Sequence, residues 1–309
     1  MIALKPPGDL QNVALIGFGE AGSILGEDLA KLGLEVVTYD ILFDSPASRE
    51  TMLPKARAAG VRPRDSLREA VNGAQLVISA VTASSSSAVA TSAAQVLHSK
   101  QYFLDINSVS PATKRNNARA VESSGADYVE AAVMAAIPQQ RLTVPMLLGG
   151  RKAAALEPVL RSLGMNVTTI ASEVGTASAI KMCRSILIKG LEALTVECLF
   201  AARAFGAEIK VLSSLDRSFP HMGWGGNLPD YLVSRVAEHG RRRAAEMREV
   251  AQTLRDIGLE PVMASATAER QQWLTDRLDA KGLAYRHDEP FAWRALADAL
   301  TEQDTRRGE

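Results

Sequence analysis

Short apolar runs alternate with amphipathic segments through the first half of the chain. Seven runs rich in Val, Ile, Leu and aromatic residues predict strands, at residues 13–16, 35–39, 76–81, 102–106, 128–133, 145–149 and 165–170. Between them, residues 21–32, 66–72 and 111–124 have the apolar spacing of helices. Strands that alternate with helices in this way predict a parallel sheet covered on both faces.

The pattern changes after residue 172. Residues 176–205 contain no proline, and apolar residues recur there at helical spacing: Ile180, Cys183, Leu187, Leu191, Leu194 and Cys198. This pattern predicts one long helix, which must bury its apolar stripe. We therefore predict an α/β Rossmann-type doubly wound sheet in residues 1–172, followed by an all-α C-terminal domain in residues 173–309.

Composition narrows the class of protein. The 309 residues include 35 Lys and Arg against 35 Asp and Glu, which gives no overall electrostatic case for nucleic acid or an anionic membrane. No apolar run reaches the roughly 18 residues of a membrane span, and the start of the chain does not resemble a secretory signal. The two cysteines lie about 22 Å apart on the predicted helix, too far for an intrachain disulfide, and no metal-ligand spacing is found. We expect a cytoplasmic enzyme that acts on a small molecule.

A glycine-rich turn follows the first predicted strand. Residues 17–22 read G-F-G-E-A-G and open the first predicted helix, and Asp40 ends the next strand. In this context the glycines permit a tight turn, backbone approach to a pyrophosphate and close helix–strand packing, while the acid accepts hydrogen bonds from ribose hydroxyls. A carboxylate also repels a 2′-phosphate, so NAD is favoured and NADP stays possible. The cofactor-binding candidates here are Gly17, Phe18, Gly19, Glu20, Ala21, Gly22 and Asp40.

Residues at the ends of two further predicted strands extend this candidate site. Val81 and Thr82 follow one predicted strand, and Asn107 follows another. Ligands of open α/β sheets bind at the carboxyl ends of strands, so these residues are also cofactor candidates. Ordinary turn chemistry explains the same residue types equally well.

Together these segments resemble the β-hydroxyacid dehydrogenase superfamily, which includes 3-hydroxyisobutyrate and 6-phosphogluconate dehydrogenases. Residues 105–111, D-I-N-S-V-S-P, are similar to its D-x-S-T-x-S-P segment, and residues 130–136, E-A-A-V-M-A-A, resemble its D-A-P-V-S-G-G segment. Residues 175–185, G-T-A-S-A-I-K-M-C-R-S, resemble its catalytic G-x-G-x-x-x-K-x-x-x-N. The resemblance implies a catalytic role for Lys181 and Ser185, and substrate binding by Ser108, Val133, Met134 and Ala135.

The sequence departs from the superfamily motifs at several positions. Met134 replaces a serine and alanines replace both glycines of the substrate segment, which suggests a bulkier or less polar substrate. Ser185 replaces the asparagine four residues after Lys181, and the late K-D-L element falls at residues 245–247 without its lysine. The C-terminal half resembles a divergent subgroup with an uncharacterised domain.

Lys181 would act as general acid and base in hydride transfer. A lysine serves both directions when its pKa approaches neutrality, and the positive end of the helix together with Arg184 favours the neutral amine. A solvated surface lysine is the alternative interpretation.

A second set of candidates lies in the C-terminal half. His239 and Arg242 would bind a substrate carboxylate or phosphate, or else belong to a solvated basic face paired with Glu246. Trp224 would line the substrate pocket or pack between helices.

The leading hypothesis is an NAD(P)-dependent dehydrogenase or reductase acting on a hydroxy acid or related alcohol. The alternatives are an imine reductase and a protein that binds NAD(H) without turnover. The resemblance also implies a homodimer formed through the long helix.

Overall fold

The chain divides into two compact units, Met1–Met182 and Cys183–Glu309. The computed structural model describes residues 10–286 and 289–301. Within those residues, no helix is both long and apolar enough to cross a bilayer.

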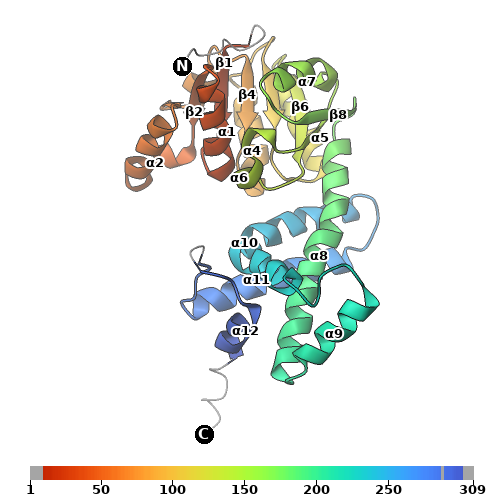
Figure 1. Cartoon of the computed structure of the whole chain (residues 1–309). Helices are drawn as coiled ribbons and strands as arrows, with labels where there is room; N and C mark the ends of the chain where they lie inside the picture. Colours follow the sequence, from red (N-terminus) through yellow and green to blue (C-terminus); the bar gives the residue numbers. More distant parts are fainter. Residues whose placement is uncertain (1–9, 287–288, 302–309) are drawn as a thin grey trace. The chain divides into compact units, whose positions relative to one another are not determined.

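The first unit is built on one eight-stranded sheet (Figure 1). Its strands follow the order β3-β2-β1-β4-β5-β6-β7-β8. Their bounds are β1 Asn12–Ile16, β2 Glu35–Tyr39, β3 Arg62–Pro63, β4 Leu76–Ser79, β5 Tyr102–Asp105, β6 Asp127–Val133, β7 Met146–Gly149 and β8 Val167–Ala171. Successive strands are added on one side of β1 up to β3 and on its other side from β4 onward. The position between β1 and β4 is therefore the topological switch point, where such sheets bind ligands.

Helices cover both faces of this sheet. Val13 and Leu15 of β1 join one apolar cluster, whereas Ala14 and Ile16 join another on the opposite face. A strand buried on both faces is typical of the doubly wound fold, which the sequence predicted. The helices are α1 Glu20–Lys31, α2 Pro46–Ala58, α3 Leu67–Val71, α4 Ser86–Ala94, α5 Pro111–Glu122, α6 Ile137–Gln140 and α7 Ala153–Ser162.

Two strands, β7 and β8, depart from the predicted parallel arrangement. β7 pairs antiparallel with β6, whereas β7 and β8 are parallel to each other. The connection between β6 and β7 contains only the four-residue helix α6 and a short 3-10 turn, too little to cross back over the sheet. Arg141 fixes this connection to α1 through Asp28, at 2.6 Å, and Glu27, at 2.7 Å.

The second unit is helical, as predicted. α8, Thr176–Ala204, begins in the first unit and continues into the second, which also contains α9 Glu208–Ser218, α10 Leu228–Arg255, α11 Val262–Ala280 and α12 Trp293–Thr301. Its core gathers apolar side chains of these helices, among them Val196, Leu199, Val236, Leu274 and Trp293.

The face of α8 that this unit buries is not the predicted apolar stripe. Leu187 is 77% exposed and Leu194 55% exposed, and both cysteines are exposed. Lys189 and Glu192 are buried instead, because Glu246 and Arg243 of α10 pair with them at 2.5 Å. Burial lowers the pKa of Lys189 and raises the pKa of Glu192. The described residues of the chain therefore leave Leu187 and Leu194 of the apolar stripe exposed.

Candidate cofactor and catalytic site

The glycine turn between β1 and α1 is closed by contacts that exclude larger residues. Gly17 has φ of +93°, and a Cβ there would lie 2.5 Å from the carbonyl oxygen of Ala80. A Cβ on Gly22 would lie 2.0 Å from the carbonyl oxygen of Gly17. Gly19 differs, because a Cβ built on it meets no protein atom within 4 Å. The turn is thus tightly packed at Gly17 and Gly22 and open at Gly19.

The open position coincides with the N-terminus of α1. Gly19 is the N-cap residue, and no side chain caps the helix. The first amides of an α-helix have no partner within the helix, so they are available to an anion. Glu20 and Ala21 contribute to this first turn through their backbone, while the Glu20 side chain is exposed.

Asp40 lies directly after β2, beside the same turn. Its Oδ2 accepts a hydrogen bond from Phe18 N at 2.6 Å, and its Oδ1 accepts one from Leu42 N at 2.9 Å. An ionised carboxylate has about four acceptor sites, so two stay available for hydroxyl groups. The geometry fits a dinucleotide, with amides for the pyrophosphate and a carboxylate for the ribose.

The Asn107 side chain has a structural role, and its predicted cofactor contact stays a prediction. Its side chain is buried, accepts from Val81 N at 2.7 Å and donates to Ser79 Oγ at 2.9 Å. It therefore fixes the ends of β4 and β5 to each other. The Thr82 hydroxyl lies 3.0 Å from Ser85 Oγ.

A buried polar network supports the end of β5, and sequence reasoning missed it. Asp105 accepts hydrogen bonds from Lys114 Nζ at 2.8 Å, Tyr128 Oη at 2.8 Å, Asn117 Nδ2 at 3.2 Å and Asn107 N at 2.9 Å. Burial and the Asp105 charge raise the pKa of Tyr128 well above its usual value. The sequence around Lys114 gave no sign that its amine is buried. The charge of the amine is compensated by Asp105, which precedes α5.

Lys181 and Ser108, predicted from separate motifs, lie together. Lys181 Nζ donates a hydrogen bond to Ser108 Oγ, and both side chains are half-buried. Ser108 follows β5, and Lys181 lies in the second turn of α8. The structure therefore places an amine and a hydroxyl at the carboxyl end of the sheet.

Glu130 holds the start of α8, a role that its motif did not indicate. Its Oε1 accepts from Gly175 N at 2.7 Å and from Ala177 N at 3.1 Å, and its Oε2 accepts from Ser178 Oγ at 2.9 Å. The side chain is fully buried. A carboxylate at a helix N-terminus is favoured by the helix dipole, so Glu130 positions the helix that carries Lys181.

The rest of the predicted substrate segment follows β6. Val133 is buried at the strand end, Met134 is half-buried and donates through its N–H to Pro145 O at 2.8 Å, and Ala135 is exposed. None of these three side chains carries a hydroxyl, and their predicted contact with a substrate stays a prediction.

Two predicted site residues of the second unit, Trp224 and Arg242, contact other residues of that unit. Trp224 is buried in the helical core, which agrees with the packing alternative given above, and its predicted role in substrate binding stays a prediction. Arg242 is exposed and pairs with Glu246 at 2.9 Å, the paired basic face given above as its alternative.

His239 is not suited to donate a proton at neutral pH. Burial, together with Arg235, Arg242 and Arg243, lowers its pKa to about 4. Ser185 is buried, and its Oγ lies 3.4 Å from Lys189 Nζ.

Comparison with known proteins identifies the family. The family model described as the NAD binding domain of 6-phosphogluconate dehydrogenase matches residues 12–171, and a domain of unknown function (DUF1932) matches residues 202–274. A solved conserved hypothetical protein from Sinorhizobium meliloti 1021 is 34% identical, with a TM-score of 0.75 over 96% of this chain and 98% of its own. The chain belongs to the β-hydroxyacid dehydrogenase superfamily.

Curated relatives in this superfamily include named enzymes. Human mitochondrial 3-hydroxyisobutyrate dehydrogenase is 25% identical over 69% of this chain, and the match spans 62% of the human protein. The NAD-dependent L-serine dehydrogenase of Pseudomonas aeruginosa is 25% identical over 70% of this chain and 72% of its own length. The superfamily resemblance and the NAD-binding first unit are confirmed.

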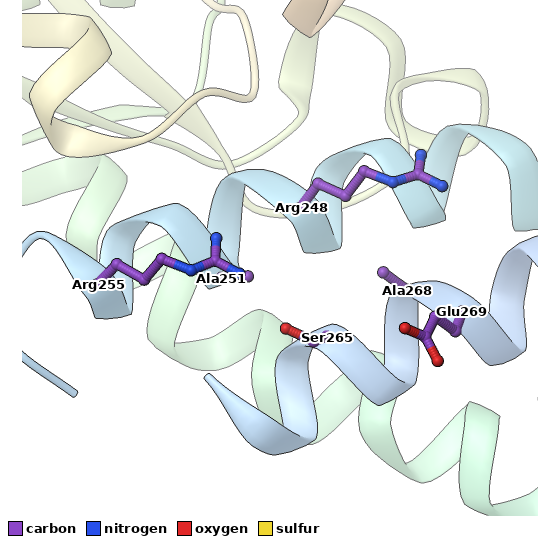
Figure 2. Close-up of a pocket in the computed structure, with 6 residues that line it drawn as sticks. All are labelled: Arg248, Ala251, Arg255, Ser265, Ala268 and Glu269. Carbon is purple, nitrogen blue, oxygen red and sulfur yellow. The ribbon is translucent and has the colours of Figure 1, made fainter. Parts of the chain in front are cut away.

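Each unit has a surface hollow, and neither of these two hollows is lined by a predicted site residue. A hollow of about 150 Å³ lies between α10 and α11 and is lined by Arg248 and Arg255 of α10 and by Ser265 and Glu269 of α11 (Figure 2). A shallow groove of about 640 Å³ runs along the outer face of α5 in the first unit. Neither hollow belongs to the superfamily site described above.

Proposed function

We propose that this protein is an NAD-dependent dehydrogenase or reductase that transfers hydride between the nicotinamide ring and a hydroxy acid or related alcohol. The observation that carries the proposal is the contact of Lys181 with Ser108, at the carboxyl end of a sheet whose glycine turn fits a dinucleotide. The superfamily supports the reaction class, and the named relatives support a β-hydroxy acid as the class of substrate.

The residues around the turn would hold the cofactor. Amides at the start of α1 would bind the pyrophosphate, and Asp40 would accept from the ribose hydroxyls. Its negative charge favours NAD over NADP. When bound, the nicotinamide supplies the hydride acceptor or donor.

Lys181 would handle the proton of the substrate hydroxyl. In oxidation the neutral amine takes that proton as hydride leaves, and in reduction the ammonium returns it to the forming alkoxide. In the ammonium form Lys181 donates to Ser108 Oγ, which leaves the Ser108 hydroxyl proton to donate to a substrate oxygen.

Two further features complete the proposal. The exposed apolar stripe of α8 supports a homodimer, because the described residues of one chain leave it exposed. The altered positions Met134 and Ser185 support a substrate that differs from those of the named relatives. We place the protein in the cytoplasm, with a small molecule as its partner.

The catalytic assignment is tested by three variants in an NADH absorbance assay with a panel of β-hydroxy acids. Lys181→Ala should lower kcat by about 10²–10⁴-fold while NADH binding is retained. Lys181→Arg keeps the positive charge but gives up no proton, so it should be equally impaired. Lys210→Ala, at an exposed lysine of α9, is the control.

Retained turnover in Lys181→Ala would remove Lys181 from the mechanism. Binding of NADH without turnover on any hydroxy acid or ketone would favour the non-catalytic alternative. Activity restricted to C=N substrates would favour the imine reductase.

A further inference from the structure

Lys55 of α2 is a basic side chain of the first unit that reaches the glycine turn. Its Nζ donates a hydrogen bond to the carbonyl oxygen of Phe18 at 3.5 Å, and the same amine lies over the Phe18 ring, 5.8 Å from its centre. An aromatic ring attracts a cation placed over its face, which helps to hold the amine at this position. Because Phe18 lies between Gly17 and Gly19, a positive charge stands beside the turn that fits a dinucleotide.

Phe18 also connects this amine to Asp40. Phe18 N donates to Asp40 Oδ2 at 2.6 Å, while Phe18 O accepts from Lys55 Nζ. One residue spans at most about 4 Å from its nitrogen to its carbonyl oxygen, so the amine and the carboxylate lie within about 10 Å of each other. An ammonium and a carboxylate therefore flank the same residue of the turn.

The amine has no carboxylate partner in the described part of the chain. Two other basic side chains of α2 and β3 are paired, since Arg49 contacts Asp65 at 2.6 Å and Arg62 contacts Glu35. Among the described residues, the Lys55 amine contacts only a carbonyl oxygen and an aromatic ring. Its charge is a point charge on a flexible four-carbon stem, the form in which lysine binds phosphate groups.

Neither of the residues directly after Asp40 carries a positive charge. Ile41 and Leu42 are apolar, and they are 75% and 46% exposed. A charge that meets a phosphate beside Asp40 must therefore come from another element. Arg64 is a second basic residue at this edge of the sheet, since it follows β3, which pairs with β2. Its Nε is buried without a hydrogen-bond partner among the described residues, so the test has to separate Arg64 from Lys55.

We infer that Lys55 determines cofactor specificity by offering a positive charge to the 2′-phosphate of NADPH. Asp40 accepts from the ribose hydroxyls of NADH and repels a 2′-phosphate, whereas the ammonium attracts that phosphate and offsets part of the repulsion. The chain should therefore bind NADPH as well as NADH. The inference rests on the cofactor site of the proposed function, and it adds a residue that lies outside the superfamily motifs given above.

Calorimetric titration of NADH and NADPH into Lys55→Met tests the inference without any turnover. Methionine keeps an unbranched side chain and removes the charge, and the position is exposed, so the fold should be preserved. The variant should bind NADPH about 3- to 10-fold more weakly than wild type, as expected for the loss of one solvated phosphate contact, and NADH within about twofold. Lys55→Arg keeps the charge and should retain the wild-type ratio of the two affinities.

Lys152→Met is the matched control. Lys152 is exposed like Lys55, but it follows β7, which lies four strand spacings, or about 19 Å, from β1 across the sheet. Its replacement should leave both affinities unchanged. Asp40→Ala should bind NADPH more tightly than wild type, and Lys55→Met added to it should reverse part of that gain.

The outcomes that overturn the inference are distinct from one another. Unchanged NADPH affinity in Lys55→Met would refute it, and a loss confined to Arg64→Met would assign the phosphate to Arg64. Equal losses for NADH and NADPH would show that the amine acts on the pyrophosphate, which both cofactors share.

The same titrations report the proposed function separately. If NADH binds but neither wild type nor Asp40→Ala binds NADPH, the inference fails and the proposed function stands. Absence of NADH binding to wild type would refute both, since the cofactor site itself would then be wrong.

Discussion

Removal of the Glu130 side chain should destabilise the fold much more than loss of its charge alone. Glu130 is fully buried and accepts three hydrogen bonds, from Gly175 N at 2.7 Å, Ser178 Oγ at 2.9 Å and Ala177 N at 3.1 Å. In Glu130→Ala, the serine hydroxyl keeps its bond to Gly175 O, at 3.0 Å, but two backbone N–H groups lose their acceptor. An unsatisfied buried group costs about 1–3 kcal/mol, and a cavity adds to that. We expect a loss of about 3–6 kcal/mol.

Glu130→Gln should cost much less. The amide oxygen can accept from both backbone N–H groups, and the amide NH2 can donate to Ser178 Oγ, which already donates to Gly175 O. Only the charge assistance and the interaction with the helix dipole are lost, about 1–2 kcal/mol.

Urea unfolding at neutral pH measures both variants, with Glu122→Gln as the control. Glu122 forms a surface ion pair with Arg151 at 3.2 Å, so its change should stay within about 0.5 kcal/mol. Because Glu130 holds the helix that carries Lys181, Glu130→Ala should also lower kcat where the variant still folds. A loss for Glu130→Ala as small as that of Glu122→Gln would refute the reasoning.

Two further predictions follow from single side chains. Asp40→Ala should raise the relative affinity for NADPH over NADH, since it removes a charge that repels a 2′-phosphate; an unchanged preference in fluorescence titrations would count against the ribose contact. The pKa of His239 is lowered to about 4 in the folded protein, from about 6.5 in the unfolded chain. As the pH falls from about 6.5 to about 4, the unfolded chain therefore takes up the proton first, and the free energy of unfolding decreases by up to roughly 1–3 kcal/mol. His239→Gln should remove that part of the acid dependence in urea unfolding, and an unaltered pH profile would show that the histidine is not so perturbed.

The sequence predicted the parts of the molecule whose signals are local. The glycine turn, Asp40 after the second strand and the alternation of strands and helices depend on residues close together in the chain. The motif of the superfamily also brought Lys181 and Ser108, 73 residues apart, into one expected site. The reversed direction of β7 and β8 was missed because a short apolar run carries no sign of its direction.

Sequence reasoning mainly missed which charged side chains are buried. Lys114 and Lys189 resemble surface lysines in sequence, and each is buried because of one distant carboxylate, Asp105 or Glu246. Glu130 contacts a helix that begins 46 residues later. Such partners are known only once the chain has folded, so the buried polar face of α8 could not be read from its apolar periodicity.

The central claim is that a dinucleotide pyrophosphate binds the opening turn of α1. Calorimetric titration of NADH into wild type and Gly19→Ala tests it most directly. The added methyl meets no protein atom within 4 Å, and urea unfolding of the variant beside wild type checks that it is folded. The account predicts binding to wild type and loss of binding in Gly19→Ala, because the methyl occupies the space of the pyrophosphate. Absence of binding to wild type, or equal affinity of a folded Gly19→Ala, would contradict it.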